Sequence, residues 1–166
     1  FIGNKRQVKP MLTALAKWCE ERNYPFYFSI EATMNLADDE ELLELMRQAD
    51  FRFVFMGIET PDPDLLAMTQ KRVNSMKPIV ERVNKIYEHG LVISAGFILG
   101  FDNENEGIGR AMNACIEDTS IVIAMVGLLV ALPNTQLARR LQAEQRLIST
   151  DLQVYTDTQR PYRLVT

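Results

Sequence analysis

The sequence contains few of the residues that build metal centres. Among its 166 residues there are two cysteines and one histidine. Cys19 and Cys115 lie far apart, so with His89 they cannot form a zinc or iron–sulfur ligand set at any recognised spacing. We therefore expect no metal site made by this chain alone, and we expect both cysteines to be buried free thiols. His89 falls in the last turn of an expected helix, where a cation interacts favourably with the helix dipole. This structural role is preferred over a catalytic one.

Long apolar runs and blocks of basic charge are also absent. The longest apolar stretch, 121–132, is too short to cross a bilayer, and no signal peptide is visible. The net charge is −4 and no Lys/Arg stripe occurs, which argues against a nucleic-acid surface. No Walker loop, Gly-x-Ser-x-Gly elbow or Gly-x-Gly-x-x-Gly fingerprint is present. These absences predict a cytoplasmic protein without a membrane span or a nucleic-acid partner.

The overall composition is that of a globular domain. Hydrophobic residues make up 47% of the chain and charged residues 24%, as in soluble domains that bury a core. The chain begins at Phe1, without a methionine, in what resembles the end of a strand. We therefore expect it to be a piece of a longer protein.

Strand-like apolar runs alternate with helical patterns along the chain. Buried strands are expected near 26–28, 51–57, 91–100 and 120–132, with a possible further stub at Phe1. Helices are expected at 8–22 with Trp18 inward, at 38–49 and 65–69, from Pro78 to Gly90, and at 106–118 and 135–144, while 148–166 stays extended or irregular. This order predicts an α/β fold, a parallel sheet with flanking helices. Four or five strands cannot close an eight-stranded barrel, so the sheet is either doubly wound or an arc of a larger barrel.

Acidic residues follow several of the expected strands. Glu59 comes after the break at Gly57, the 102–104 turn follows the third strand, and Glu31 ends the first. Ligands of parallel α/β proteins bind at the carboxyl ends of the strands, and carboxylates accept hydrogen bonds from ribose hydroxyls or an amino group. Gly96 and Gly100 would let a planar base approach the backbone, but a bulge or tight packing at Gly96 and a turn at Gly100 are the preferred explanation.

Five segments, taken together and in order, resemble the radical S-adenosylmethionine enzymes. More narrowly, they resemble the branch that carries an N-terminal cobalamin-binding domain and includes the hopanoid methylases. The similarity covers nearly the whole chain. The segments are FIGNKR at 1–6, FSIEATMNLADDEELLELM at 28–46, FMGIETPD at 55–62, GFILGFDNE at 96–104 and AMVGLLVALPNTQL at 124–137.

The resemblance implies a partial (β/α)6 TIM-like barrel. In that superfamily a Cys-x3-Cys-x2-Cys loop after the first strand binds a 4Fe-4S cluster, which reductively cleaves S-adenosylmethionine to a 5′-deoxyadenosyl radical. That loop is missing here, so we expect the cluster ligands to lie upstream of Phe1. Residues 1–147 would then be an arc of about four to five strands, from the end of the second barrel strand to the sixth strand and its helix. Residues 148–166 would start a following region.

The resemblance also suggests which residues contact S-adenosylmethionine. Strand-end polar residues would face its ribose and amino-acid portions, the glycine-rich segment would contact adenine, and the end of the sixth strand would lie near adenine. The strand-end polar residues are Glu31, Glu59 and Thr60. The glycine-rich segment contributes Gly96, Ile98, Gly100, Asp102 and Glu104, and the end of the sixth strand contributes Leu132 and Pro133. No catalytic residue is expected. Two departures from the family pattern occur, Ile30 in place of a more common Thr and Asn134 in place of Gly, the second being mild because Asn tolerates the left-handed conformation.

The implied activity is that of a cobalamin-dependent C-methyltransferase acting on a small molecule or a lipid, with cobalamin on a separate domain and a reductant protein serving the cluster. The isolated chain would be inactive because it lacks the cluster ligands. Two alternatives stay open: a radical enzyme that oxidises, cyclises or rearranges its substrate, or a non-catalytic nucleotide-type binding module. Because a barrel arc leaves its first strand edge and its inner apolar surface uncovered, we also expect the chain to self-associate through that edge or surface.

Overall fold

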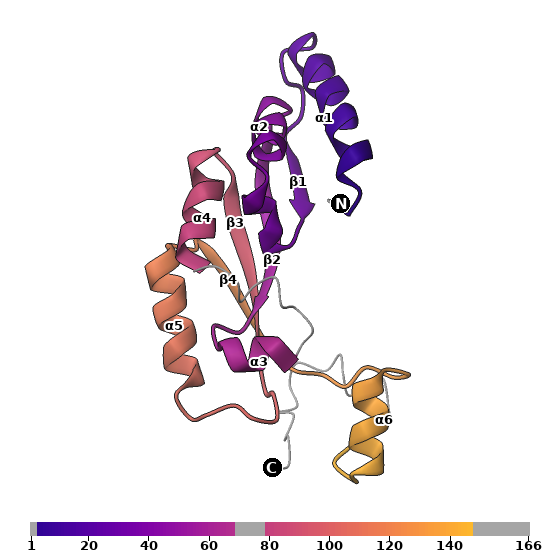
Figure 1. Ribbon diagram of the computed structural model, residues 1–166, viewed down its shortest axis with the longest axis vertical. Helices are drawn as coiled ribbons and strands as arrows, with labels where there is room; N and C mark the ends of the chain where they lie inside the picture. The colour runs from indigo at the N-terminus through magenta and orange to yellow at the C-terminus, as the bar shows by residue number, and fades with distance from the viewer. Residues whose placement is uncertain (1–2, 69–78, 148–166) are drawn as a thin grey trace. The chain divides into compact units, whose positions relative to one another are not determined.

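The computed structural model describes residues 3–68 and 79–147, and it contains the expected alternation of strands and helices (Figure 1). The expected stub at Phe1, the helix start at Pro78 and the segment 148–166 lie outside the described residues. The elements are α1 Lys5–Glu20, β1 Phe28–Glu31, the 3₁₀ helix η1 Met34–Asp38, α2 Glu40–Gln48, β2 Phe51–Glu59, α3 Pro63–Met68, α4 Ile79–Glu88, β3 Val92–Leu99, α5 Ile108–Thr119, β4 Ile123–Leu128 and α6 Gln136–Ala143.

The described strands form one sheet in the order β1-β2-β3-β4, and β2 pairs in parallel with both β1 and β3. This is the predicted sheet. The chain divides into two compact units, Phe1–Gly127 and Leu128–Thr166. The boundary at 147 that the resemblance implies stays a prediction. No helix among the residues the structure describes is long and apolar enough to span a membrane.

The core of the first unit lies on one face of the sheet. Alternate residues of β2 and β3 point to this face, where Val54 pairs with Ile93 and Met56 with Ala95, and all four are fully buried. Helices α2, α4 and α5 contact these strands, and α4 and α5 also contact each other (Figure 1). The helices therefore cover this face, and their apolar side chains join those of the strands in the buried core.

We call the opposite side of the sheet the open face. It carries Ser29, Glu31, Phe53, Phe55, Gly57, Ser94, Gly96 and Ile98, none of which is buried. Phe53 is 38% exposed. The apolar sequences of these strands predicted burial on both faces, and that prediction is wrong for the part of the chain described, because helices cover only one face.

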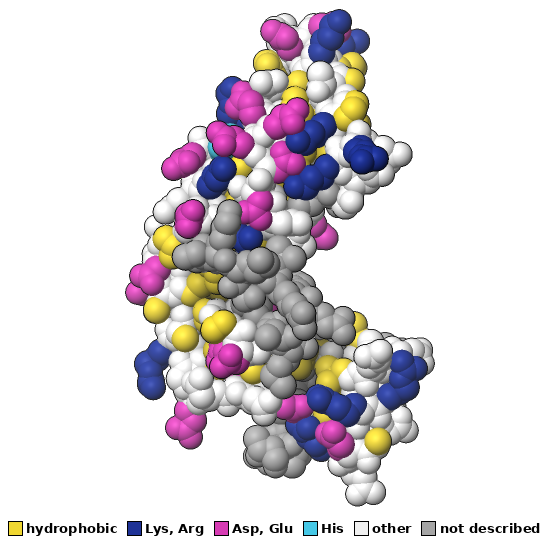
Figure 2. Space-filling model, viewed as in Figure 1, with side chains coloured by type: hydrophobic (Ala, Val, Ile, Leu, Met, Phe, Trp, Pro, Cys, Tyr) yellow, Lys and Arg dark blue, Asp and Glu magenta, His cyan; other side chains and the backbone are white. Residues whose placement is uncertain are grey.

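Asp39 joins α1 to α2. Its Oδ1 accepts a hydrogen bond from the N–H of Leu42 at 3.1 Å, which caps the start of α2. Its two oxygens also lie 3.1 Å from Lys5 Nζ and 2.9 Å from Lys9 Nζ, both on α1. Burial by itself would raise the pKa of Asp39, but the hydrogen bonds from Lys9, Lys5 and Leu42 outweigh it, so the pKa is lowered. Figure 2 shows acidic and basic side chains interspersed over this part of the molecule.

Trp18 and β4 differ from prediction. Trp18 was expected inward, but it is 36% exposed and stacks on Phe26 with a centroid separation of 6.2 Å, because Val8, Leu12 and Cys19 form the buried stripe of α1. The strand expected near Phe26 begins at Phe28 instead. Every residue of β4 is exposed, contrary to the buried strand predicted there. In the described part of the chain β4 is the last strand of the sheet, so it lacks a neighbour on one side.

The second unit contains α6 and a small apolar cluster of Ala131, Ala138 and Leu141. Thr135 caps α6, since its Oγ1 accepts a hydrogen bond from the N–H of Ala138 at 3.2 Å. Asn134 adopts a φ of 65° just before this cap. The expectation that Asn tolerates the left-handed conformation at this position is confirmed.

We predict that Asp39→Ala lowers the free energy of unfolding by about 1–2 kcal/mol at neutral pH, because it removes a helix cap and two partly exposed ion pairs. Asp39→Asn keeps a capping oxygen and should lose less. A carboxyl with a lowered pKa stabilises the fold above its ordinary value of 3.8, and that stabilisation disappears as the pH falls through the lowered pKa. Urea unfolding at several pH values should therefore show the Asp39→Ala difference narrowing in acid, and a pH-independent difference would contradict the ion-pair contribution.

Candidate functional site at the carboxyl ends of the strands

The carboxyl end of β2 contains a β-bulge. Gly57 pairs with Gly96 and Glu59 pairs with Phe97, so Ile58 is an extra residue in β2. Glu59 then adopts a φ of 70°, in the left-handed region that non-glycine residues rarely occupy. Ile58 before it and Thr60 after it are both fully buried. Bulges at strand ends change the direction of the following side chain, and here the affected residue is the predicted site residue Glu59.

A tight turn follows Glu59. The N–H of Thr60 donates to the carbonyl of Ile58 at 2.9 Å, and the Oγ1 of Thr60 accepts from the N–H of Asp62 at 3.3 Å. Asp62 Oδ1 in turn accepts from the N–H groups of Asp64, at 2.9 Å, and Leu65, at 3.3 Å, at the start of α3. Asp62 was not among the residues expected to organise the site, although Asp after Thr-Pro and before a helix is the signal of such a cap.

The carboxyl end of β3 is closed by Glu104. Gly100 has a φ of 103°, and its N–H donates to Glu104 Oε2 at 2.7 Å. The N–H of Glu104 donates to the carbonyl of Phe101 at 3.1 Å. The other carboxylate oxygen, Oε1, is buried and has no hydrogen-bond partner among the described residues. A buried acceptor without a donor is costly, so Glu104 has the capacity to accept one more hydrogen bond.

Gly96 is explained by packing. A Cβ at this position would lie 3.0 Å from Cζ of Phe55 on the neighbouring strand, so the Phe55 ring occupies the space of a side chain at 96. Of the bulge or tight packing expected at Gly96, the tight packing is confirmed. Ile98 lies two residues further along the same open face. Asp102 follows in the loop before α5 and makes further polar or electrostatic interactions within the chain.

Glu31 does not lie level with Glu59. It pairs with Phe55, and the N–H of Ala32 donates to the carbonyl of Phe55 at 3.0 Å. Phe55 pairs with Ser94 and Glu59 with Phe97, so the two levels lie three residues apart on β3, or about 10 Å along the strand. The structure thus joins Glu59 directly to β3 through its pairing with Phe97, whereas Glu31 lies on the open face at the level of Phe55.

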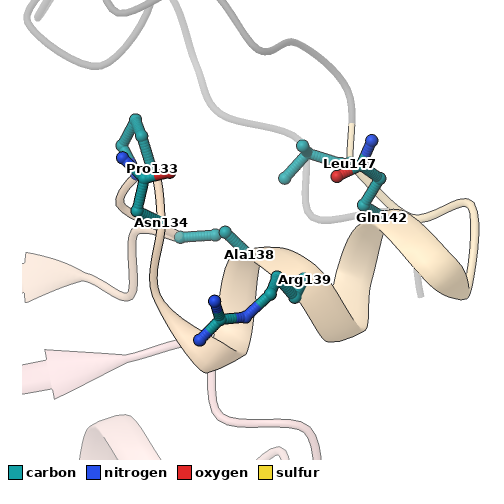
Figure 3. A pocket seen from close by; sticks show the side chains of 7 residues that line it. Pro133, Asn134, Ala138, Arg139, Gln142 and Leu147 are labelled. Atoms are coloured by element: carbon teal, nitrogen blue, oxygen red, sulfur yellow. The ribbon is translucent and has the colours of Figure 1, made fainter.

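Leu132 and Pro133 belong to the second unit, where Leu132 is 56% exposed. Pro133 lines a shallow pocket at α6 (Figure 3). Asn134 also comes from the segment before the helix, while Arg139 and Gln142 come from the helix and Leu147 from the segment after it. Arg139 and Gln142 carry no specific signal in the sequence, because their spacing is that of any exposed helical face.

The described residues do not form a metal centre. No group of three His, Cys, Asp or Glu side chains that could hold an ion occurs within 3–68 and 79–147. Cys19 is buried as predicted, whereas Cys115 is only half-buried. Burial raises the pKa of both thiols, with smaller contributions from Asp50 for Cys19 and Asp118 for Cys115, so neither thiolate is favoured. A 4Fe-4S cluster does not fit these residues.

One buried cation was not predicted. Arg82 on α4 is only 5% exposed and lies 3.0 Å from Asp38 Oδ2, at the end of η1. This ion pair links α4 to the segment that follows β1. Helical periodicity places Arg82 beside the buried Val83, but it gives no sign that an arginine rather than an apolar residue would be buried there.

We predict that Glu104→Ala accelerates hydrogen exchange of the Gly100 amide about fivefold or more, because Glu104 Oε2 is its acceptor. Glu104→Gln keeps an acceptor oxygen and should change the rate less. The Gly90 amide, which donates to the carbonyl of Tyr87 at 2.8 Å, is the matched control and should be unaffected. Equal Gly100 exchange rates in the original protein and in Glu104→Ala would contradict the assignment.

The chain is similar to several methyltransferases. It is 47% identical over 89% of its length to an uncharacterized methyltransferase of Synechocystis sp., and 40% identical over 91% to the hopanoid C-2 methylase of Rhodopseudomonas palustris. It spans 28% and 29% of the lengths of these two proteins.

Solved structures share the fold. The radical S-adenosylmethionine methyltransferase TsrM from Kitasatospora setae, determined with cobalamin and a [4Fe-4S] cluster, matches 82% of this chain and 26% of its own, with a TM-score of 0.67 and 20% identity. Methylornithine synthase matches 77% of this chain and 36% of its own, with a TM-score of 0.53 and 17% identity. The sheet is therefore an arc of a partial barrel of this type. The family model described as Radical SAM superfamily matches residues 3–115, more than half of the chain, and the protein belongs to the radical SAM superfamily.

Proposed function

We propose that this chain is the S-adenosylmethionine-binding part of a cobalamin-dependent methyltransferase that acts on a small molecule or a lipid. Its membership of the radical SAM superfamily supports the cofactor, and its similarity to a hopanoid methylase supports the reaction and the substrate class. The fold match to a methyltransferase solved with cobalamin supports the second cofactor. The observation that carries the proposal is the left-handed Glu59 at the carboxyl end of β2, next to β3 in a sheet of this family.

The acceptors at the strand ends fit the donors of S-adenosylmethionine. This cofactor has an ammonium group, two ribose hydroxyls and an adenine amino group. Glu59 would accept from the hydroxyls, and Glu104 has a buried carboxylate oxygen with capacity for one donor. The Gly96–Gly100 backbone would contact adenine, and Ile98 and Asp102 would complete this side of the site. Glu31, Leu132 and Pro133 are further proposed contacts.

When bound, the cluster and S-adenosylmethionine supply one-electron cleavage and hydrogen abstraction, and cobalamin supplies the methyl group. We propose that the cluster ligands and the cobalamin site lie outside this chain. The contribution of this chain is to fix the cofactor with carboxylates held by β2 and β3, and to exclude water from it with the apolar open face. A reductant protein would serve the cluster, and the cytoplasm is the proposed compartment. By itself the chain would be inactive.

The first experiment is anaerobic expression of a full-length protein containing this chain. We expect iron and sulfide at the ratio of one 4Fe-4S cluster, and formation of 5′-deoxyadenosine from S-adenosylmethionine on reduction. An iron-free protein that leaves S-adenosylmethionine intact would favour a non-catalytic binding module.

In the cluster-loaded protein, Glu59→Gln should weaken S-adenosylmethionine binding about tenfold, measured by equilibrium dialysis, because a charged acceptor is lost. Unchanged affinity in both Glu59→Gln and Glu31→Gln would reject the site.

We also propose that the isolated chain self-associates, and that the contact is β4 rather than the first strand edge expected from the sequence. Ile123, Met125, Val126 and Leu128 are between 44% and 51% exposed on the last described strand of the sheet. Exposed apolar strand edges pair with other chains. Light scattering at high concentration should give a mass above that of one chain, and the double substitution Met125→Lys with Val126→Lys should reduce it. Met11→Lys, at a 42% exposed apolar residue of α1, is the control. A monomer at every concentration would reject this proposal.

A further inference from the structure

We propose that Thr60 does not contact S-adenosylmethionine but is a positioning residue, which holds Glu59 in its left-handed conformation at the end of β2. This inference rests on the proposed function of Glu59. It changes the role of Thr60 from a cofactor contact to a residue that acts through its neighbour. It also adds Asp62 to the residues on which cofactor binding depends.

The burial of Thr60 argues against a direct contact. Its side chain is fully buried, and the residue two positions earlier, Ile58, is fully buried as well. The Oγ1 of Thr60 accepts a hydrogen bond from the N–H of Asp62. A ligand at the strand ends therefore meets the partly exposed Glu59 before it could reach the hydroxyl of Thr60.

The backbone on both sides of Glu59 is fixed by hydrogen bonds. The N–H of Thr60 donates to the carbonyl of Ile58 at 2.9 Å across Glu59, which makes the turn tight. The Thr60 hydroxyl then fixes the N–H of Asp62, and the Asp62 carboxylate binds the first N–H groups of α3. Glu59 is thus held between a buried strand and the start of a helix.

Such support is required because of the conformation of Glu59. A φ of 70° is unfavourable for an L residue with a long side chain, and it persists only where the surrounding structure enforces it. Without the Thr60 hydroxyl, the 60–62 segment loses its acceptor and Glu59 can relax toward an ordinary strand conformation. The carboxylate would then leave the position from which it accepts the hydrogen bonds of the cofactor.

The test is a double-mutant cycle on the cluster-loaded, full-length protein, with S-adenosylmethionine affinity measured by equilibrium dialysis. Thr60→Val, which keeps the shape but removes the acceptor, should weaken binding about five- to tenfold. Thr60→Ser keeps the hydroxyl and should stay within about twofold of the original protein. In a Glu59→Ala background, Thr60→Val should have less than about a twofold effect, because Thr60 acts through Glu59.

Thr119→Val is the matched control. Thr119 is also buried, at 1% exposure, and its hydroxyl donates to the carbonyl of Cys115 at the end of α5, away from the strand-end turn. This variant should bind S-adenosylmethionine like the original protein. If Thr60→Val does not fold, Asp62→Ala replaces it in the cycle, since Asp62 fixes the other end of the same turn.

The outcomes separate this inference from the proposed function. If Glu59→Ala leaves the affinity unchanged, the proposed site fails and the inference fails with it. If Glu59→Ala weakens binding but Thr60→Val does not, only the inference is overturned. If both weaken binding and their effects add fully, Thr60 acts independently of Glu59, which also overturns the inference.

Discussion

In the described part of the chain, helices cover only one face of this parallel sheet, and the arrangement of the candidate site depends on that constraint. Strand side chains alternate between faces, so Val54, Met56 and the residues that pair with them are committed to the helical side. The residues between them are left on the open face, which no described helix covers. The extra residue Ile58 interrupts this alternation at the end of β2 and allows Glu59 to leave the regular pleat.

The ends of β2 and β3 are stabilised in the same way. In each case a side-chain oxygen accepts a backbone N–H within four residues, Thr60 from Asp62 and Glu104 from Gly100. Both turns contain a residue with positive φ, Glu59 in one and Gly100 in the other. The two side chains differ in the hydrogen-bond acceptors that they leave unused. Thr60 uses its buried hydroxyl locally, whereas Glu104 keeps one buried carboxylate oxygen without a donor among the described residues.

Much of the fold could be predicted from the sequence because apolar periodicity records local structure. The strand-end position of Glu59 followed from the break at Gly57, and the alternation of strands and helices predicted a parallel sheet. The bulge at Ile58 could not be predicted, since it is a property of the pairing between β2 and β3 rather than of either sequence. The predictions that Trp18 and β4 are buried failed for a related reason. Trp18 and β4 are apolar in sequence, but whether such residues are covered depends on neighbours that periodicity does not reveal.

Arg82 shows a second limit of prediction from the sequence. Its burial is set by Asp38, a residue of another element 44 positions away in the sequence, and a pattern read along one helix carries no trace of that partner. The pairing of Glu31 with Phe55 is similar. All strand-end acids look equivalent in sequence, yet the register of the sheet separates Glu31 from Glu59 along the strand direction.

The contact between Phe55 and Gly96 makes two positions on different strands a single steric unit. The ring fills the volume that a side chain at 96 would need, so the sizes of the residues at 55 and 96 are not independent. A smaller residue at 55 would open a hollow in the middle of the open face, bounded by a glycine backbone on one side. One substitution on β2 can therefore enlarge the free volume on the open face while the strand-end turns stay as they are.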